Sequence, residues 1–202
     1  MQQSPPLGRA PVLADDFAAS GFRVRVDLGQ HFLRSPDSAR RLLERAAIPS
    51  GSQVLEVGAG LGTLSATIAA AGYRIWAVEK DGRLRRQLDQ QLCEFGDRAR
   101  ITIDDVRRVD LDQGLEPGST LVSIMPFAPE LATTLVRHVF DSPHLVRGLV
   151  VLPMLGAEQL AADDAAGLRV EEVDGISRAD FYPPVPTVLR VVAIERTQPC
   201  ST

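Results

Sequence analysis

Apolar residues along this chain fall into two patterns that alternate. Short apolar runs, typical of buried strands, lie at residues 53–57, 74–78, 100–103, 120–124 and 149–152. Segments in which apolar residues recur with helical spacing lie at residues 63–71, 82–95, 130–140 and 155–162. This alternation predicts an α/β fold of the doubly wound, Rossmann-like class, with a mostly parallel sheet and helices on both faces.

Both ends of the chain depart from this alternation. Residues 1–24 contain three prolines and little periodicity, which predicts a flexible N-terminal arm. Ser35 and Pro36 have the N-cap and first-turn chemistry of a helix start. Near the other end, the apolar runs at residues 168–173 and 188–194 have no predicted helix between them. We therefore expect these two runs to form an antiparallel hairpin at one end of the sheet.

The composition is that of a globular protein with one well-buried core. The chain has 202 residues, 45% hydrophobic and 24% charged, so we expect residues 25–202 to form a single domain. A net charge of −4 provides no positive field that would draw the chain onto nucleic acid, which weighs against a strong RNA binder. The longest apolar run is interrupted by Pro153 and is too short to span a bilayer. The two cysteines of the chain have no metal-ligand spacing and follow no secretory signal, which predicts a cytoplasmic location.

The segment VLEVGAGLGT, residues 54–63, is the strongest local motif. A short apolar run leads into Gly58, Gly60 and Gly62, after which a helix is predicted. Glycines let the backbone approach a ligand closely, and the helix N-terminus presents free N–H groups. The nicotinamide fingerprint G-x-G-x-x-G needs glycine where this chain has Thr63, which weakens a dinucleotide interpretation. By itself, the loop is also compatible with a simple tight turn.

Acidic residues follow the next two predicted strands. Glu79 ends the second strand, where a carboxylate can accept both hydroxyls of a ribose that lies across the edge of the sheet. Asp105, after the third strand, could accept the exocyclic amine of an adenine, as could the neighbouring Asp104, or either could cap the following turn. Together the loop and the acids describe a pocket for an adenosine-like ligand without a pyrophosphate. S-adenosylmethionine fits this description better than NAD.

Four groups of segments carry a family resemblance. They are LGQHFL at residues 28–33, VLEVGAGLGTLS at 54–65 with AVEKD at 77–81, DDVRRVDL at 104–111 and FYPPVPTV at 181–188. In order and content they resemble the G-Q-N-F-L segment, the first two cofactor motifs, the G-D-A-L segment and the F-x-P-P-P-K-V loop of the rRNA adenine dimethyltransferases. That family includes the erythromycin-resistance methyltransferases. The match runs from about residue 26 to residue 196.

The resemblance implies a class I methyltransferase sheet and S-adenosylmethionine as the cofactor. It implies that His31 and Leu33 lie near the methionine end of the cofactor, that Glu79 binds the ribose and that Asp105 binds the adenine. The full set of cofactor-binding residues that it implies is Gln30, His31, Leu33, Glu56, Gly58, Gly60, Glu79, Asp105 and Ser123.

One motif of the family is altered at the position where its chemistry takes place. The fourth strand of the family ends in Asn-Leu/Ile-Pro-Tyr/Phe, and the same positions here are Ile124, Met125, Pro126 and Phe127. In the family, the Asn carbonyl holds a hydrogen of the adenine amine while the aromatic residue stacks on the base. Ile124 has no acceptor, and this loss is expected to cost about 2 to 4 kcal/mol, or about a hundredfold or more in rate.

Other departures also favour a changed acceptor. His31 replaces the Asn of the first motif, and Pro186 stands where the loop usually has Lys. The sequence ends at Thr202 without the helical C-terminal domain that helps the family to hold rRNA, and its pI is about 5.4. We therefore expect methylation of a small molecule in a biosynthetic pathway rather than of rRNA adenine.

Four residues are candidates for chemistry on such an acceptor. Phe127 could stack on a flat substrate, and Tyr182 on the long loop could close over it. His31 could take a proton from a hydroxyl group, and Glu130 is a second candidate base. Simpler roles for the last two are packing for His31 and a favourable charge at a helix N-terminus for Glu130.

Two other hypotheses remain open from the sequence. The protein could have lost methyl transfer and serve as a cyclase, a rearrangement catalyst or a binding protein that uses its apolar pocket. Alternatively, it could retain rRNA adenine N6-methylation despite the altered motif.

Overall fold

The computed structural model describes residues 21–25, 29–163 and 167–197. Residues 1–20 of the expected arm therefore lie outside the described part of the chain. Phe22 and Val24, which are described, pack against a small apolar cluster formed by Phe32, Leu61 and Leu84. Within the described ranges, no helix combines the length and the apolar character needed to cross a membrane.

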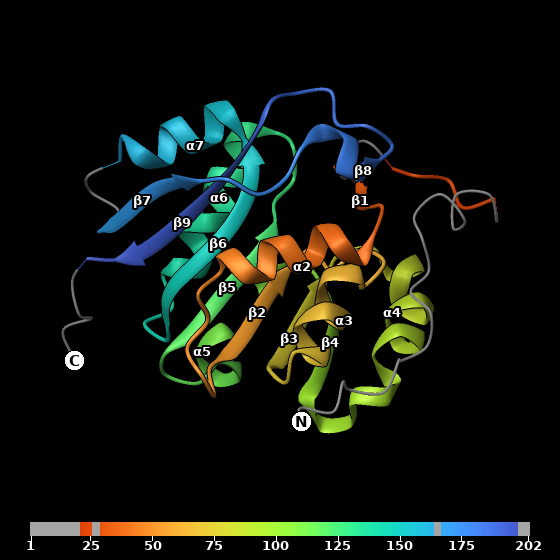
Figure 1. Ribbon diagram of the computed structural model, residues 1–202. Coiled ribbons are helices and arrows are strands. Elements are labelled where there is room, and N and C mark those ends of the chain that lie inside the picture. The colour runs from red at the N-terminus through yellow and green to blue at the C-terminus, as the bar shows by residue number, and fades with distance from the viewer. Residues whose placement is uncertain (1–20, 26–28, 164–166, 198–202) are drawn as a thin grey trace, which may run out of the picture.

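A seven-stranded sheet with the order β4-β3-β2-β5-β6-β9-β7 forms the centre of the molecule (Figure 1). Its strands are β2 (Gln53–Val57), β3 (Arg74–Glu79), β4 (Ala99–Ile103), β5 (Ser119–Ile124), β6 (Leu145–Pro153), β7 (Leu168–Val173) and β9 (Leu189–Arg196). Strands β2 to β6 pair in parallel, whereas β9 is antiparallel to both β6 and β7. The expected α/β fold class is confirmed, including the antiparallel strands at one end of the sheet.

Helices cover the two faces of this sheet (Figure 1). One apolar cluster joins one face of the sheet to α2 (Pro36–Arg45), α3 (Thr63–Ala70) and α4 (Arg85–Leu92). A second cluster joins the other face to α5 (Leu111–Gly114), α6 (Pro129–Phe140) and α7 (Met154–Ala161). Val54 belongs to the first cluster and Leu55 to the second, because successive strand side chains point to opposite faces.

Short helical turns and capping residues define the element boundaries. Ser35 caps α2, and Pro36 occupies its first position, as the sequence predicts. The helix expected at residues 82–95 is divided into η2 (Gly82–Leu84), α4 and η3 (Cys93–Arg98). Among the described residues, two further 3-10 turns are η4 (Val106–Arg108) and η6 (Arg178–Asp180).

A separate two-stranded sheet lies over one edge of the molecule (Figure 1). It pairs β1 (Phe32–Leu33) with β8 (Phe181–Tyr182) in antiparallel fashion. The pairing brings the segment that precedes α2 against the long proline-rich connection between β7 and β9. The sequence does not predict this sheet, because two-residue strands are too short to show an alternating pattern.

Candidate functional site

The main cavity lies at the carboxyl ends of the parallel strands, at the point where the strand order reverses. The chain proceeds from β2 outward through β3 to β4, then returns to place β5 on the opposite side of β2. This arrangement leaves a crevice above β2 and β5, where doubly wound sheets bind their ligands. The cavity has a volume of about 210 Å³ and is lined by the glycine loop, by the ends of β3, β4 and β5, and by residues 29–33.

The glycine loop requires its glycines for both conformation and space. Gly58, Gly60 and Gly62 have φ angles of 78°, 58° and 82°, in the left-handed region that side chains disfavour. A Cβ atom at Gly60 would also lie 3.1 Å from the ring of Phe32, and one at Gly62 would lie 3.1 Å from Leu88. The loop can therefore pack under residue 32 and turn directly into α3.

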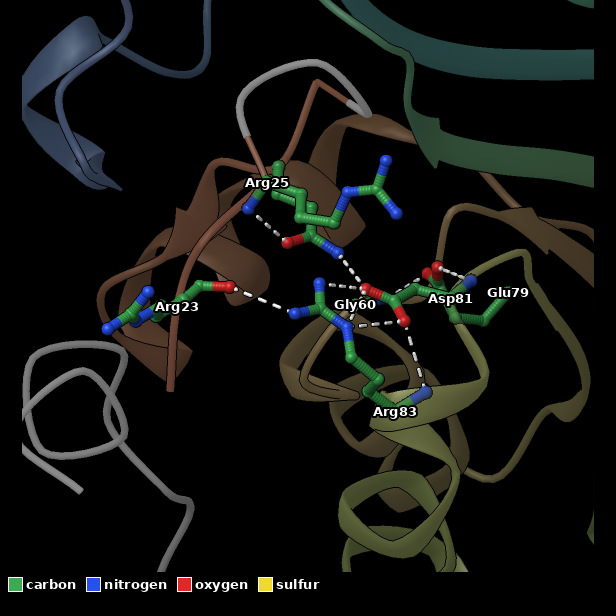
Figure 2. Close-up of polar contacts among 7 residues, drawn as sticks. Arg23, Arg25, Gly60, Glu79, Asp81 and Arg83 are labelled. Carbon is green, nitrogen blue, oxygen red and sulfur yellow. Dashed lines mark hydrogen bonds and ion pairs between the residues drawn. The ribbon is translucent and has the colours of Figure 1, made fainter. Parts of the chain in front are cut away.

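Glu79 is a buried carboxylate that faces the glycine loop. Its Oε2 accepts a hydrogen bond from the backbone N–H of Gly60 at 2.8 Å, and its Oε1 accepts one from Asp81 N–H at 2.8 Å (Figure 2). Burial raises the pKa of Glu79, while these backbone donors oppose the shift. The carboxylate thus lies at the tip of β3, where the sequence places a ribose acceptor.

Asp105 lies between two cations at the rim of the cavity. Lys80 Nζ is 2.9 Å from its carboxylate, and Arg107 Nη2 is 2.6 Å from it. Hydrogen bonding to Arg107 is the main cause that lowers the pKa of Asp105, so this group stays ionised near neutral pH. Any adenine amine that binds here shares the carboxylate with both cations, which also line the cavity.

Glu56 forms part of the cavity wall in the middle of the sheet. The hydroxyl of Ser65 donates a hydrogen bond to its Oε2. Burial raises the pKa of Glu56 to about 8, partly opposed by the Ser65 hydrogen bond and reinforced by Glu79. In the cofactor-free protein this side chain is therefore mostly protonated at pH 7.

His31 and two phenylalanines form a cluster beside the end of β5. His31 Nδ1 lies 2.8 Å from the carbonyl oxygen of Pro183. Its ring meets Phe127 edge-to-face at 5.1 Å, and Phe127 meets Phe181 edge-to-face at 5.5 Å between ring centroids. Phe181 is completely buried. Phe127 thus lies between His31, just before β1, and Phe181 of β8.

Most of the expected cofactor-binding residues lie around this one cavity. Those that line it are Gln30, His31, Leu33, Glu56, Gly58, Gly60, Glu79 and Asp105. Ser123 is not among the lining residues, because its hydroxyl donates to the carbonyl of Val57 at 2.6 Å inside the sheet.

Three of the four expected catalytic residues lie outside the cavity lining. Phe127 packs between His31 and Phe181, and the guanidinium of Arg34 lies over the ring of Tyr182 at 5.6 Å. Glu130 is exposed in the first turn of α6. Only His31 of that group lines the cavity, and the roles of all four stay predictions.

Several lining residues were missed from the sequence. Leu131 and Leu135 of α6 form an apolar side of the cavity, and their i, i+4 spacing is a signal that could have found them. Lys80 and Arg107 were missed because their pairing with Asp105 depends on side-chain conformations across two loops.

The donor set fits S-adenosylmethionine. A carboxylate buried at the tip of β3 suits the ribose hydroxyls, and apolar residues beside the glycine loop suit the adenine ring. The carboxyl groups of Glu56, Glu79 and Asp105 complement a cofactor with a positively charged sulfonium and ammonium group.

Comparison with known proteins decides the family. The sequence model described as "Ribosomal RNA adenine dimethylase" matches residues 21–169, which is most of the chain. The chain belongs to the ribosomal RNA adenine dimethylase family. The expected family is therefore confirmed. Its members are S-adenosylmethionine-dependent methyltransferases, which supports the expected enzyme class and cofactor.

Curated relatives support the same family. The chain is 32% identical over 175 residues to ribosomal RNA small subunit methyltransferase A of Rhodococcus erythropolis, a match that covers 84% of this chain and 56% of the relative. It is 28% identical over 197 residues to the protein of that name in Deinococcus radiodurans, covering 90% of this chain and 65% of the relative. The chain spans about half the length of the first curated relatives that it matches, with 56%, 52% and 50% of their lengths covered.

Solved structures share the fold at low sequence identity. The 23S rRNA methyltransferase ErmE has a TM-score of 0.68 and 20% identity, with 85% of this chain and 72% of that chain covered. A dimethyladenosine transferase from Plasmodium falciparum has a TM-score of 0.67 and 17% identity, with coverage of 81% and 62%.

These findings overturn two expectations from the sequence. The expectation of a small-molecule acceptor in a biosynthetic pathway is wrong, and so is the expectation that nucleic acid is disfavoured as a partner. The family model and the relatives are those of rRNA methyltransferases. The same findings give no support to a cyclase, a rearrangement catalyst or a binding protein. The error has a physical reason, since net charge sums over the whole chain and does not describe one surface. The change at Ile124 removes one acceptor and leaves the rest of the cavity in place.

Proposed function

We propose that this chain transfers methyl groups from S-adenosylmethionine to the N6 amine of an adenine in ribosomal RNA, with small-subunit RNA as the substrate. The observation that carries this proposal is the family match over residues 21–169, which includes the glycine loop, Glu79 and Asp105. The curated relatives named as small-subunit methyltransferases favour that RNA over large-subunit RNA. Action on ribosomal RNA is consistent with the cytoplasmic location expected from the sequence.

The residues of the cavity have distinct roles in this proposal. When bound, S-adenosylmethionine supplies an electrophilic methyl group on its sulfonium. Glu79 accepts the ribose hydroxyls, and Asp105 accepts the adenine amine of the cofactor. The glycine loop approaches the cofactor closely because it has no side chains at Gly58 and Gly60. Together these contacts hold the cofactor in one orientation, which is a large part of the rate enhancement.

The target adenine enters at the end of β5. Ile124, Met125 and Pro126 line the cavity there, and Phe127 lies at its margin. Stacking of the target base on Phe127 would keep the amine in the plane from which it attacks the methyl group. The division into an arm at residues 1–24 and one domain at 25–202 also remains a proposal.

A methylation assay on ribosomal RNA tests this function. The purified chain is incubated with methyl-labelled S-adenosylmethionine and unmodified small-subunit or large-subunit rRNA, and the digested RNA is analysed by mass spectrometry. We expect N6-methylated adenosine in the small-subunit RNA. A Glu79→Gln variant serves as the cofactor-site control and is expected to lose most of this product.

Two outcomes contradict the proposal in different ways. Methylation of large-subunit RNA alone would overturn the choice of RNA. Tight cofactor binding by calorimetry, without any methylated adenosine in either RNA, would overturn the reaction itself.

A further inference from the structure

The cavity wall lacks a side-chain acceptor at the position where the target amine must be held. Ile124 is the last residue of β5, lines the cavity and is half-buried. Its neighbours Met125 and Pro126, which also line the cavity, carry no side-chain oxygen or nitrogen. An amine positioned for attack needs an acceptor for its N–H, because its lone pair is otherwise delocalised into the purine ring.

His31, which lies just before β1, presents such an acceptor. Its Nδ1 is 2.8 Å from the carbonyl oxygen of Pro183. A carbonyl oxygen can only accept, so Nδ1 is the donor in this hydrogen bond. In the neutral imidazole, the proton on Nδ1 leaves Nε2 with a lone pair. His31 also lines the cavity, so its ring is a candidate acceptor at the site.

Packing places His31 beside the turn that follows Ile124. Its ring is in edge-to-face contact with Phe127 at 5.1 Å. Two residues earlier, the backbone at Gly29 approaches so closely that a Cβ there would lie 3.2 Å from the side chain of Pro126. The segment at residues 29–31 therefore lies directly on the Pro126–Phe127 turn, where the target base enters.

Four other acceptors of the cavity are already engaged elsewhere. Gln30 donates to Asp81 at 2.6 Å, and Glu56 accepts from Ser65. Glu79 accepts hydrogen bonds from the backbone N–H groups of Gly60 and Asp81. Asp105 is paired with its two cations. These groups lie with Thr63 and Asp104 around the glycine loop and the ends of β3 and β4, whereas His31 contacts the Pro126–Phe127 turn.

We propose that Nε2 of His31 accepts a hydrogen bond from the N6 amine of the target adenine and replaces the acceptor that is missing at Ile124. This inference rests on the proposed function. The Pro183 carbonyl fixes the ring, Phe127 supports its edge, and the hydrogen bond to Nε2 orients the amine toward the methyl group. His31 is then a catalytic residue of the reaction, and Ile124 forms an apolar wall beside it.

A double-mutant cycle tests the exchange of roles between the two positions. The variants are His31→Ala, Ile124→Asn and the combination of both, with His144→Ala as a matched control just before β6. Single-turnover methyl transfer to small-subunit rRNA and the Kd for S-adenosylmethionine are measured for each. We expect His31→Ala to slow transfer at saturating cofactor by about a hundredfold, and His144→Ala to transfer at the parent rate.

The decisive variant is the combination. If His31 supplies the missing acceptor, an Asn at position 124 restores transfer in the His31→Ala chain to within about tenfold of the parent rate. A purely structural role, such as support for the Pro183 loop or for Phe127, gives no such rescue. A combined variant as slow as His31→Ala, or a His31→Ala variant as fast as the parent, overturns the inference alone. A parent chain that methylates no adenine in either RNA overturns the proposed function and the inference with it.

Discussion

Gln30 Nε2 donates a buried hydrogen bond of 2.6 Å to Asp81 Oδ2, although the two residues are 51 positions apart in the sequence. The same glutamine accepts from the backbone N–H of Arg25 at 2.8 Å, and Arg83 donates to Asp81 and to the carbonyl of Arg23 (Figure 2). The end of β3 is thereby joined to the segment that precedes β1. Because Glu79 also accepts from Asp81 N–H, this network supports the cofactor side of the cavity.

Replacing Gln30 with glutamate should break this network in a pH-dependent way. At pH 7, Gln30→Glu places a second carboxylate against Asp81, whose pKa is held at about 2, mainly by hydrogen bonding to Arg83. We expect the free energy of unfolding to fall by about 2 kcal/mol, measured by urea denaturation. Near pH 4 the new carboxyl group is protonated and can donate to Asp81, so stability should approach that of the parent at the same pH.

Gln30→Met is the control, because it removes the hydrogen bonds without adding a charge. Its loss of stability relative to the parent should be similar at pH 7 and pH 4. A Gln30→Glu variant without any recovery on acidification would contradict the electrostatic explanation.

Replacing Glu79 should weaken cofactor binding. In Glu79→Gln the amide has only one oxygen, so one of the backbone N–H groups of Gly60 and Asp81 faces an NH₂ group. The ribose also loses a charged acceptor. We expect the Kd for S-adenosylmethionine to rise about 30-fold, measured by calorimetry. Glu116→Gln, an exposed residue paired with Arg74 far from the cavity lining, should bind the cofactor as the parent does.

Gly114 should tolerate no side chain. A Cβ atom there would overlap the six-membered ring of Trp76, which is fully buried and donates from Nε1 to Thr102 at 2.9 Å. We expect Gly114→Ala to lower the free energy of unfolding by about 3 kcal/mol in chemical denaturation. At Gly82 the nearest atom to an added Cβ is 3.7 Å away, so Gly82→Ala should change stability by less than about 1 kcal/mol. Equal effects at both glycines would show that the clash with Trp76 is relieved.

The central sheet was predictable because most of its strands carry a short apolar run, and β7 still has apolar residues at Leu168, Val170 and Val173. Strand β6 begins at Leu145 rather than at the predicted residue 149. Its first half was missed because Arg147 and Gly148 interrupt the apolar run. The sheet formed by β1 and β8 could not be predicted, since its pairing joins residues about 150 positions apart with only two residues on each side.

The cavity was predictable where a residue type follows a strand end. Glu79 and Asp105 lie at the tips of adjacent parallel strands, so the order of strands brings them to one crevice. Ser123 does not line the cavity, because its hydroxyl donates to the carbonyl of Val57, and its role in cofactor binding stays a prediction. The class of acceptor was misjudged because the loss of one acceptor at Ile124 and the net charge of the whole chain were given more weight than the segments that match the family.

Stability should depend on pH through Glu56. Burial raises the pKa of this carboxyl from 4.5 to about 8, so between these values the folded protein holds a proton that the unfolded chain has lost. The free energy of unfolding of the cofactor-free protein should therefore fall as the pH rises through this window. This pH dependence of the free energy of unfolding should be absent in Glu56→Gln, which keeps the side-chain shape and an acceptor for the Ser65 hydroxyl. Thermal melts of both proteins from pH 5 to pH 8 check this, and parallel curves would contradict it.

Cofactor binding should release the proton that Glu56 holds. S-adenosylmethionine carries a net positive charge near neutral pH, and a cation in the cavity favours the ionised carboxylate. Because the free protein has this group protonated up to about pH 8, the affinity should increase from pH 6 to pH 8, by as much as about tenfold per unit. Calorimetry in buffers of different ionisation enthalpy should detect the released proton. Glu56→Gln should lose most of this release. Equal proton release in the parent and in Glu56→Gln would show that Glu56 does not sense the charge of the cofactor.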